Sequence, residues 1–241
     1  MAYCSRSVAG QVEAIHPNLA QFVAKHLAHP YQRPLQPYNI EACNWLLEQW
    51  QAAGSPPIIL DSGCGVGLSS RSLSETFADY LVIGIDQSLQ RLMKAGAKKG
   101  FYQQDNLCLV RADLVDCWRL LHQQGMLPRK HFILYPNPWP KKRHLQRRWH
   151  GHPIFPYLIK LGGELEIRSN WQTYIDEFEF ALEQLDCASS GTTVYQPDIY
   201  LTPFEKKYAL SGQRLYRLTA KLDSNSRIES DTRLNQVRTN Q

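Results

Sequence analysis

The chain has 241 residues, of which 43% are hydrophobic and 20% charged. It is therefore long enough to bury a sizeable core and too apolar to be wholly disordered. The formal net charge is +5. Residues 141–150 (KKRHLQRRWH) contain five Lys or Arg and no acid, so this one segment accounts for the whole excess of positive charge. A basic segment of this kind favours a polyanionic partner.

The N-terminal residues 1–6 lead into polar sequence without the apolar core of a secretory signal. The longest apolar runs, such as residues 81–85 and 132–135, have the length of a strand rather than of a membrane span. We therefore expect a cytoplasmic protein that does not cross a membrane.

The cysteines and histidines do not suggest a disulfide framework or a metal centre. The six cysteines never form a CxxC pair, which favours reduced thiols. His144, His150 and His152 lie close together, but the basic residues around them would repel a cation. We expect these to be solvated histidines, and we expect no metal.

Residues 1–55 form an N-terminal extension in which only residues 39–51 show helical spacing of apolar side chains. Short apolar strands bounded by Gly, Asp or Pro are then expected at residues 58–60, 81–85, 108–111, 132–135 and 164–167. Helical patterns lie between and after them, at residues 68–77, 88–99, 114–124, 153–161 and 171–185. This order predicts an α/β, Rossmann-like fold with a parallel sheet and helices on both faces.

Two later strand candidates, residues 192–195 and 214–219, are joined by a long loop without a clear helical pattern. We expect them to form an antiparallel pair at the edge of the sheet. The main domain is thus predicted to span residues 56–220. Residues 221–241 are polar and are expected to be a disordered tail.

The strongest motif begins where the first strand ends, at Asp61, and continues through Gly63, Gly65 and Gly67. Glycines let the backbone adopt positive φ and approach a ligand closely at the carboxyl end of the sheet. Asp86 ends the second strand, where an acid can accept hydrogen bonds from a ribose diol. Asp113 ends the third, where a carboxylate could accept from an adenine amino group.

A nicotinamide site and a turn without a ligand are the alternatives. The third glycine comes one residue too early for the dinucleotide-binding motif, and Asp61 stands where a dehydrogenase strand is usually apolar. An acid there faces an amino or sulfonium group better than a pyrophosphate. The acid-x-Gly-x-Gly-x-Gly pattern resembles motif I of the class I methyltransferases, which implies S-adenosylmethionine as cofactor.

The fourth strand runs into residues 135–140 (YPNPWP), in which two prolines hold Asn137 in a rigid turn beside the expected cofactor. We interpret Asn137 as a catalytic position. The basic residues that follow, together with Trp149, suit a phosphate backbone. The expected partner is therefore nucleic acid, and the alternative is a basic face that contacts only solvent.

At this point a specific resemblance is present. Residues 137–144 (NPWPKKRH), followed by Arg147 and Arg148, resemble the signature PDPWxKxRH of the tRNA (guanine-N7)-methyltransferase family, which modifies the variable-loop guanine of tRNA. The similarity continues at Gly162 and Gly163, at residues 170–171, and at residues 202–205 (TPFE). It covers roughly residues 55–219.

The resemblance implies a role for each matching residue. Cofactor binding is implied for Asp61, Gly63, Gly65, Gly67, Asp86, Asp113 and Asn137. Substrate contact is implied for Lys141, Asn170, Thr202 and Glu205. The implied partner is tRNA, bound by a monomer or a homodimer.

The sequence departs from the family pattern at Asn137 and Asn170, where the family has aspartate. Guanine N7 is an unprotonated nucleophile, so methyl transfer to it needs alignment rather than a general base. An aspartate would still stabilise the cationic product ring, whereas an asparagine keeps only the hydrogen-bonding shape. We expect the family activity to be slower, altered in substrate or absent.

Two other functions stay open. An asparagine before Pro-aromatic also resembles the Asn-Pro-Pro-aromatic turn of methyltransferases that act on exocyclic amines, although the second proline is missing here. A non-catalytic RNA-binding relative would keep the fold and the basic residues. Two side chains also have structural alternatives: Glu205 could pair with Lys206 or Lys207, and Asn170 could cap the helix expected at Trp171.

Overall fold

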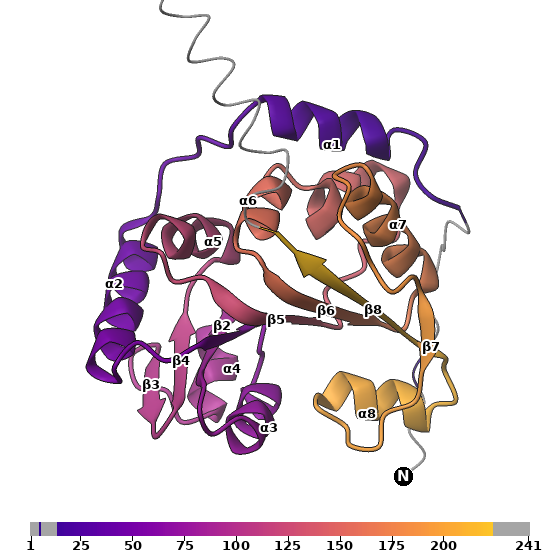
Figure 1. Ribbon diagram of the computed structural model, residues 1–241. Coiled ribbons are helices and arrows are strands. Elements are labelled where there is room, and N and C mark those ends of the chain that lie inside the picture. The colour runs from indigo at the N-terminus through magenta and orange to yellow at the C-terminus, as the bar shows by residue number, and fades with distance from the viewer. Residues whose placement is uncertain (1–4, 6–13, 224–241) are drawn as a thin grey trace, which may run out of the picture.

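The computed structural model describes residue 5 and residues 14–223. Its eight strands form a single sheet (Figure 1). They are β1 (Ile58–Ser62), β2 (Leu81–Asp86), β3 (Phe101–Gln104), β4 (Leu107–Arg111), β5 (Pro128–Leu134), β6 (Gly163–Ser169), β7 (Thr193–Tyr195) and β8 (Leu215–Leu222). In space their order is β3-β4-β2-β1-β5-β6-β8-β7.

The five central strands are parallel, and both edges of the sheet are antiparallel. β4, β2, β1, β5 and β6 pair in parallel with their neighbours. β8 pairs antiparallel with both β6 and β7, and β3 pairs antiparallel with β4. The predicted α/β fold with an antiparallel edge pair is therefore confirmed. The carboxyl ends of all five parallel strands meet at one edge, which is where ligands bind in such sheets.

The helices cover both faces of the sheet, as expected. They are α1 (Leu19–Ala28), α2 (Pro37–Ala52), α3 (Leu68–Thr76), α4 (Leu89–Lys94), α5 (Leu114–Gln123), α6 (Phe155–Lys160), α7 (Gln172–Glu183) and α8 (Pro203–Leu210), with short 3-10 turns η1 (Lys142–Arg147) and η2 (Trp149–Gly151). In Figure 1, α1, α5, α6 and α7 lie above the sheet, and α3, α4 and α8 lie below it.

The N-terminal region packs into the main core instead of standing apart from it. Leu19 and Val23 of α1 and Leu46 of α2 are buried in the same cluster as Trp118 of α5 and Phe178 of α7. Burial of aliphatic and aromatic side chains is the main stabilising contribution in such a cluster. The described part of the predicted 1–55 extension is thus an integral part of the fold.

The predicted helix over residues 88–99 is too long. α4 ends at Lys94, and Gly96 and Gly100 adopt positive φ values of 97° and 93° that a helix does not allow. The chain then forms β3, which the sequence analysis missed, and turns back into β4. The hairpin turn contains Asp105 at φ 48°.

The loop expected between the last two strands contains a helix, α8. Thr202 caps it, because the Thr202 hydroxyl accepts a hydrogen bond from the Glu205 amide at 3.0 Å, and Pro203 occupies the first turn. β8 also continues through Lys221 and Leu222, so the predicted tail begins later than residue 221. Residues 224–241, on which the rest of that prediction falls, lie outside the described residues, as do most of residues 1–13.

Among residues 14–223, no helix is long and apolar enough to cross a membrane. The five described cysteines, Cys43, Cys64, Cys108, Cys117 and Cys187, are buried free thiols.

Candidate active site

A cavity of about 670 Å³ opens at the carboxyl ends of β1, β2 and β4. It contains four of the predicted site residues, Gly63, Asp86, Asp113 and Asn137, although they come from four separate parts of the sequence. The remaining lining residues are Gln87, Ser88, Arg91, Arg111, Ala112, Leu114 and Trp149. Asp61, Gly65 and Gly67 do not line this cavity.

The glycine turn between β1 and α3 is open on one side and packed on the other. Gly63 and Gly65 adopt φ values of 84° and 60°, and a Cβ on either would meet nothing within 4 Å. A ligand could therefore approach the backbone there. Gly67 differs, because a Cβ on it would come within 2.9 Å of the Leu109 side chain. The third glycine is thus required for packing of α3 against the sheet.

Asp86 is held rigidly at the end of β2 and is only 6% exposed. One carboxylate oxygen, Oδ2, accepts a hydrogen bond from the Gly65 amide at 3.0 Å, and Oδ1 accepts one from the Ser88 amide at 2.8 Å. Arg91 lies 3.7 Å from Oδ2. A carboxylate has about four acceptor sites, so Asp86 can still accept from a ribose diol.

Asp113 begins α5, where its Oδ1 accepts a hydrogen bond from the Val115 amide at 3.0 Å. Its Oδ2 accepts one from Arg33 at 2.9 Å, and the same Arg33 nitrogen also lies 2.9 Å from Asp116. Asn39 bridges the two acids, since its side chain contacts both Asp116 and the Asp113 amide. The N-terminal region therefore borders the Asp113 end of the cavity, a contact that no sequence pattern indicated.

Asp61 lies beneath the glycine turn rather than in the cavity. It is 1% exposed, and its Oδ2 accepts hydrogen bonds from the hydroxyls of Ser69 and Ser70 at 2.6 and 2.7 Å. Burial raises the pKa of this carboxyl above its ordinary value. These contacts tie the end of β1 to the start of α3 and so fix the shape of the turn between them.

The turn after β5 presents Asn137 to solvent at the rim of the cavity. Tyr135 and Trp139, on either side of it, adopt φ values of 51° and 47°, which non-glycine residues rarely take. The Asn137 side-chain oxygen lies 3.5 Å from the Trp139 amide. Strained backbone on both sides of one polar side chain is characteristic of a functional turn.

Part of the basic segment is buried. Arg148 is 1% exposed, contacts the Trp139 carbonyl, and forms an ion pair with Glu177 of α7. His150 is fully buried and lies 2.9 Å from the same Glu177 carboxylate. The prediction of a solvated histidine is therefore wrong for His150, because a buried acid on another helix provides its partner.

The outer residues of the segment are accessible. Lys141, Lys142, Arg143 and Arg147 are all exposed and follow directly on the strained turn. Arg147 also lies over the Trp139 ring at 4.7 Å. The positive charge available to a ligand is therefore concentrated beside Asn137.

Glu205 is a buried residue of α8 and connects this helix to the strained turn. Its Oε1 accepts hydrogen bonds from the Tyr135 hydroxyl at 3.0 Å and from Arg168 at 2.9 Å, and its Oε2 accepts one from the Leu201 amide at 2.7 Å. Pairing with Lys206 or Lys207 is wrong, because the carboxylate points inward.

Asn170 lies at the end of β6, and its amide donates a hydrogen bond to Gln213 at 2.8 Å. The alternative that Asn170 caps the following helix is wrong, since α7 begins at Gln172 and the Trp171 amide is bound by the Ser169 hydroxyl. Asn170, through Gln213, thus lies near the end of α8, and Thr202 lies at its start. Glu205, within α8, connects this helix to the strained turn.

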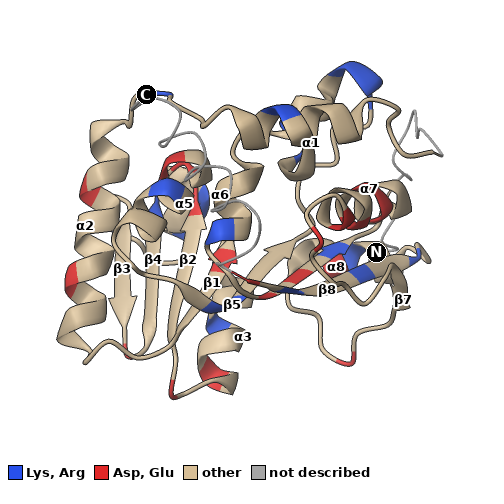
Figure 2. Cartoon of the chain, turned by 45° about the horizontal axis from the view of Figure 1, so that its top comes forward, with Lys and Arg blue, Asp and Glu red and all other residues tan. Residues whose placement is uncertain are grey.

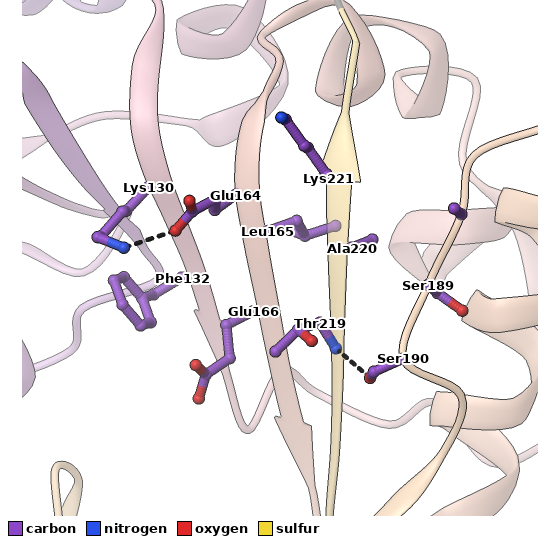
Figure 3. Close-up of a pocket in the computed structure, with 11 residues that line it drawn as sticks. Lys130, Phe132, Glu164, Leu165, Glu166, Ser189, Ser190, Thr219, Ala220 and Lys221 are labelled. Atoms are coloured by element: carbon purple, nitrogen blue, oxygen red, sulfur yellow. Dashed lines mark hydrogen bonds and ion pairs between the residues drawn. The ribbon is translucent and has the colours of Figure 1, made fainter.

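A second hollow, of about 520 Å³, lies on the lower sheet face between β5, β6 and β8 (Figure 3). Residues of these strands and of the segment 188–190 line it, and Lys130 of β5 forms a 2.6 Å ion pair with Glu164 of β6. It contains none of the predicted site residues. Among the described residues, no group of three or more His, Cys, Asp or Glu could hold a metal ion.

The sheet order and the helices on both of its faces define a Rossmann-like α/β fold. Two solved structures share this fold, each with a TM-score of 0.52. One is the 16S rRNA (adenine(1408)-N(1))-methyltransferase of Catenulisporales acidiphilia, 14% identical, with 74% of this chain and 92% of that one covered. The other is the 16S rRNA methyltransferase KamB, 13% identical, with 80% and 98% covered.

Sequence comparison gives the family. Residues 55–218 match the family model described as "Putative methyltransferase". A tRNA (guanine-N(7)-)-methyltransferase of Neisseria gonorrhoeae is 31% identical over 67% of this chain and 68% of its own length. One of Buchnera aphidicola is 25% identical over 90% of this chain and 89% of its own length. The chain belongs to the tRNA (guanine-N7)-methyltransferase family.

Proposed function

We propose that this protein transfers the methyl group of S-adenosylmethionine to N7 of a variable-loop guanine in tRNA. The observation that carries the proposal is the convergence of Gly63, Asp86, Asp113 and Asn137 on one cavity, with the exposed basic residues immediately beyond it. A protein that modifies tRNA would act in the cytoplasm, as expected from the sequence.

The residues at the cavity suit the chemistry of the cofactor. The open backbone at Gly63 and Gly65 leaves room for an amino-acid or sulfonium group, Asp86 would bind the ribose hydroxyls, and Asp113 would accept from the adenine amine. The cofactor supplies an electrophilic methyl group on a positive sulfur. The chain itself supplies position, exclusion of water and charge.

Asn137 would orient the guanine beside the cofactor. Its amide can donate to a base oxygen or accept from a base amine, and its place between two strained residues limits its movement. No proton has to be removed from N7, so a neutral amide is compatible with the reaction. It provides less stabilisation for the cationic product than a carboxylate would.

Nucleoside analysis tests the proposal. Purified protein is incubated with labelled S-adenosylmethionine and total unmodified tRNA, and the digested product is separated by chromatography. We expect label in 7-methylguanosine. Label in a methylated adenine or cytosine would instead establish an amino-group methyltransferase. Cofactor binding without transfer to any RNA would establish a non-catalytic relative.

A further inference from the structure

An aromatic ladder leads from the surface of α8 to the catalytic turn. It consists of Phe204, Tyr208 and Tyr135. The Phe204 and Tyr208 rings are stacked, with centroids 6.3 Å apart and planes 27° from parallel. The Tyr208 and Tyr135 rings lie 5.7 Å apart. Tyr135 is two residues before Asn137, so the ladder ends beside the reactive position.

The inner end of the ladder is fixed, whereas its outer end is free. The Tyr135 hydroxyl donates to the buried Glu205 carboxylate, which also binds Arg168, so α8 cannot shift without breaking a buried ion pair. Phe204, by contrast, is 45% exposed. A large aromatic face held rigidly at the surface is suited to a ligand with its own flat face.

Exposed apolar side chains are frequent in the segment of the chain that contains Phe204. Five of the ten large exposed hydrophobics in the described part of the chain come from residues 194–210, and they are Val194, Ile199, Tyr200, Phe204 and Leu210. Leu210 lies at the far end of α8 from the ladder. Exposed apolar groups concentrated in this way indicate a binding surface rather than chance exposure.

The charge around Phe204 favours an anionic partner. Lys206 and Lys207 are exposed on α8. Figure 2 shows that α7, by contrast, carries acidic residues. Glu205 is buried and paired with Arg168, so it adds no exposed negative charge. The exposed acid nearest to Phe204 in the sequence is Asp198, in the loop before α8. Cations next to exposed aromatic rings are the combination that binds single-stranded nucleic acid, by contact with phosphates and by stacking on bases.

We propose that Phe204 is a stacking platform for an unstacked base of the tRNA substrate, with Lys206 and Lys207 contacting the flanking phosphates. This rests on the proposed function for the identity of the RNA. The target guanine must leave its stack to reach Asn137, so a neighbouring base loses its stacking partner, and the Phe204 ring at the outer end of the ladder offers that neighbouring base a replacement.

The test compares the full-length wild type with Phe204→Ala, Phe204→Trp and a control, Leu127→Ala, at an exposed apolar residue that precedes β5 and lies outside the proposed surface. Each is bound to a tRNA transcript carrying 2-aminopurine at a position next to the variable-loop guanine, in the absence of S-adenosylmethionine. Stacking on an aromatic ring quenches 2-aminopurine fluorescence. We expect the saturated complex of Phe204→Ala to be clearly brighter than those of the wild type, Phe204→Trp and Leu127→Ala.

A second measurement follows methyl transfer to unmodified tRNA. Phe204→Ala should lower kcat/KM for tRNA about tenfold to a hundredfold without changing the Kd for S-adenosylmethionine, and Phe204→Trp should restore it. Equal fluorescence in all four complexes would overturn the platform. So would a dimeric wild type that Phe204→Ala makes monomeric with unchanged fluorescence. Fluorescence that depends on Phe204 in a protein that makes no 7-methylguanosine would support the platform and refute the proposed reaction.

Discussion

The buried guanidinium of Arg148 donates two hydrogen bonds to the backbone carbonyl of Trp139, from Nε at 3.2 Å and from Nη2 at 3.1 Å. Its third nitrogen, Nη1, pairs with Glu177. Trp139 has positive φ and follows Asn137 by two residues. Arg148 therefore holds the strained turn in place from behind, which makes it a positioning residue rather than a phosphate ligand.

Arg148→Lys should lower kcat more than it changes KM for tRNA. The lysine keeps the charge for Glu177, but an ammonium cannot reproduce the planar arrangement of donors that contacts the carbonyl and the carboxylate together. Displacement of a reactive group by about 1 Å costs roughly a hundredfold in rate, so a loss of kcat between tenfold and a hundredfold is expected. Steady-state kinetics with unmodified tRNA measures it.

Thermal unfolding and a matched variant separate positioning from simple instability. Arg129 is exposed on β5, and Arg129→Lys should leave both kcat and KM unchanged. Glu177→Gln removes the buried partner of Arg148 and should destabilise the fold by about 3–5 kcal/mol. An Arg148→Lys protein that is fully folded at the assay temperature and has normal kcat would refute the positioning role.

Neutralising Lys142 and Arg143 together should weaken tRNA binding and make it less dependent on salt. Both side chains are exposed and follow the turn that contains Asn137. Each phosphate contact that is lost lowers the slope of log K against log salt by about 1, so a decrease of about 2 is expected for Lys142→Ala with Arg143→Ala. Filter binding at salt concentrations from about 50 to about 200 mM measures this slope.

The Kd for S-adenosylmethionine should not change in this double variant. Lys94→Gln with Lys98→Gln removes two exposed charges near α4 and serves as a control with the same net charge. If the control weakens tRNA binding equally, net charge rather than location is responsible. If cofactor binding falls in parallel with tRNA binding, residues 142–143 support the fold instead of contacting RNA.

His131 should make the protein less stable in mild acid. It is fully buried beside Ser62, whose hydroxyl lies 2.8 Å from its Nε2, and burial lowers the pKa of His131 to about 3. The unfolded chain binds a proton near pH 6.5, whereas the folded one does not. The stability that the neutral ring provides is therefore complete above pH 6.5 and declines as the pH falls from there towards 3.

His131→Gln keeps a polar partner for Ser62 but cannot titrate. At pH 7 the variant should be the less stable of the two, because its side chain fits the buried site less well. Between pH 7 and pH 5 the wild type should lose about 2 kcal/mol more than the variant, at 1.4 kcal/mol for each pH unit below the unfolded pKa. Urea unfolding at both pH values measures the difference. Parallel losses would show that His131 does not titrate in this way.

The sequence predicted the central sheet well because its strands are short apolar runs ended by Gly, Asp or Pro. It failed where tertiary pairing decides the structure. β3 forms only because residues 101–104 pair with β4. α1 is long enough to be a helix, but its sequence has few of the polar residues that mark the start of one. The Thr-Pro-x-Glu sequence does indicate the start of α8, because a threonine three residues before a glutamate can cap a helix. From the sequence it was interpreted only through its resemblance to a substrate loop.

The same patterning explains why three predicted site residues lie at one cavity, whereas their roles stay predictions. Strand ends bring Asp86, Asp113 and Asn137 together, and strand ends can be identified from hydrophobic patterning. Contacts between distant elements cannot, so Arg33 beside Asp113 and Glu177 beside Arg148 were missed. Charge counting alone also counted Arg148 as available to a ligand, although a buried acid neutralises it.

Asn137→Asp should increase methyl transfer to guanine N7. The side chain is exposed at the cavity rim, so the new carboxylate has no buried acid to oppose it and little desolvation to overcome. A negative charge beside the base stabilises the positive charge that develops on the ring, and an increase in kcat of about tenfold is expected. Asn137→Ala, which removes both the shape and the hydrogen bonds, should lower kcat below the wild type. Unchanged transfer in Asn137→Asp, with an unchanged Kd for S-adenosylmethionine, would mean that the missing charge does not limit this enzyme, and reduced transfer would mean in addition that the amide itself is required for its reaction.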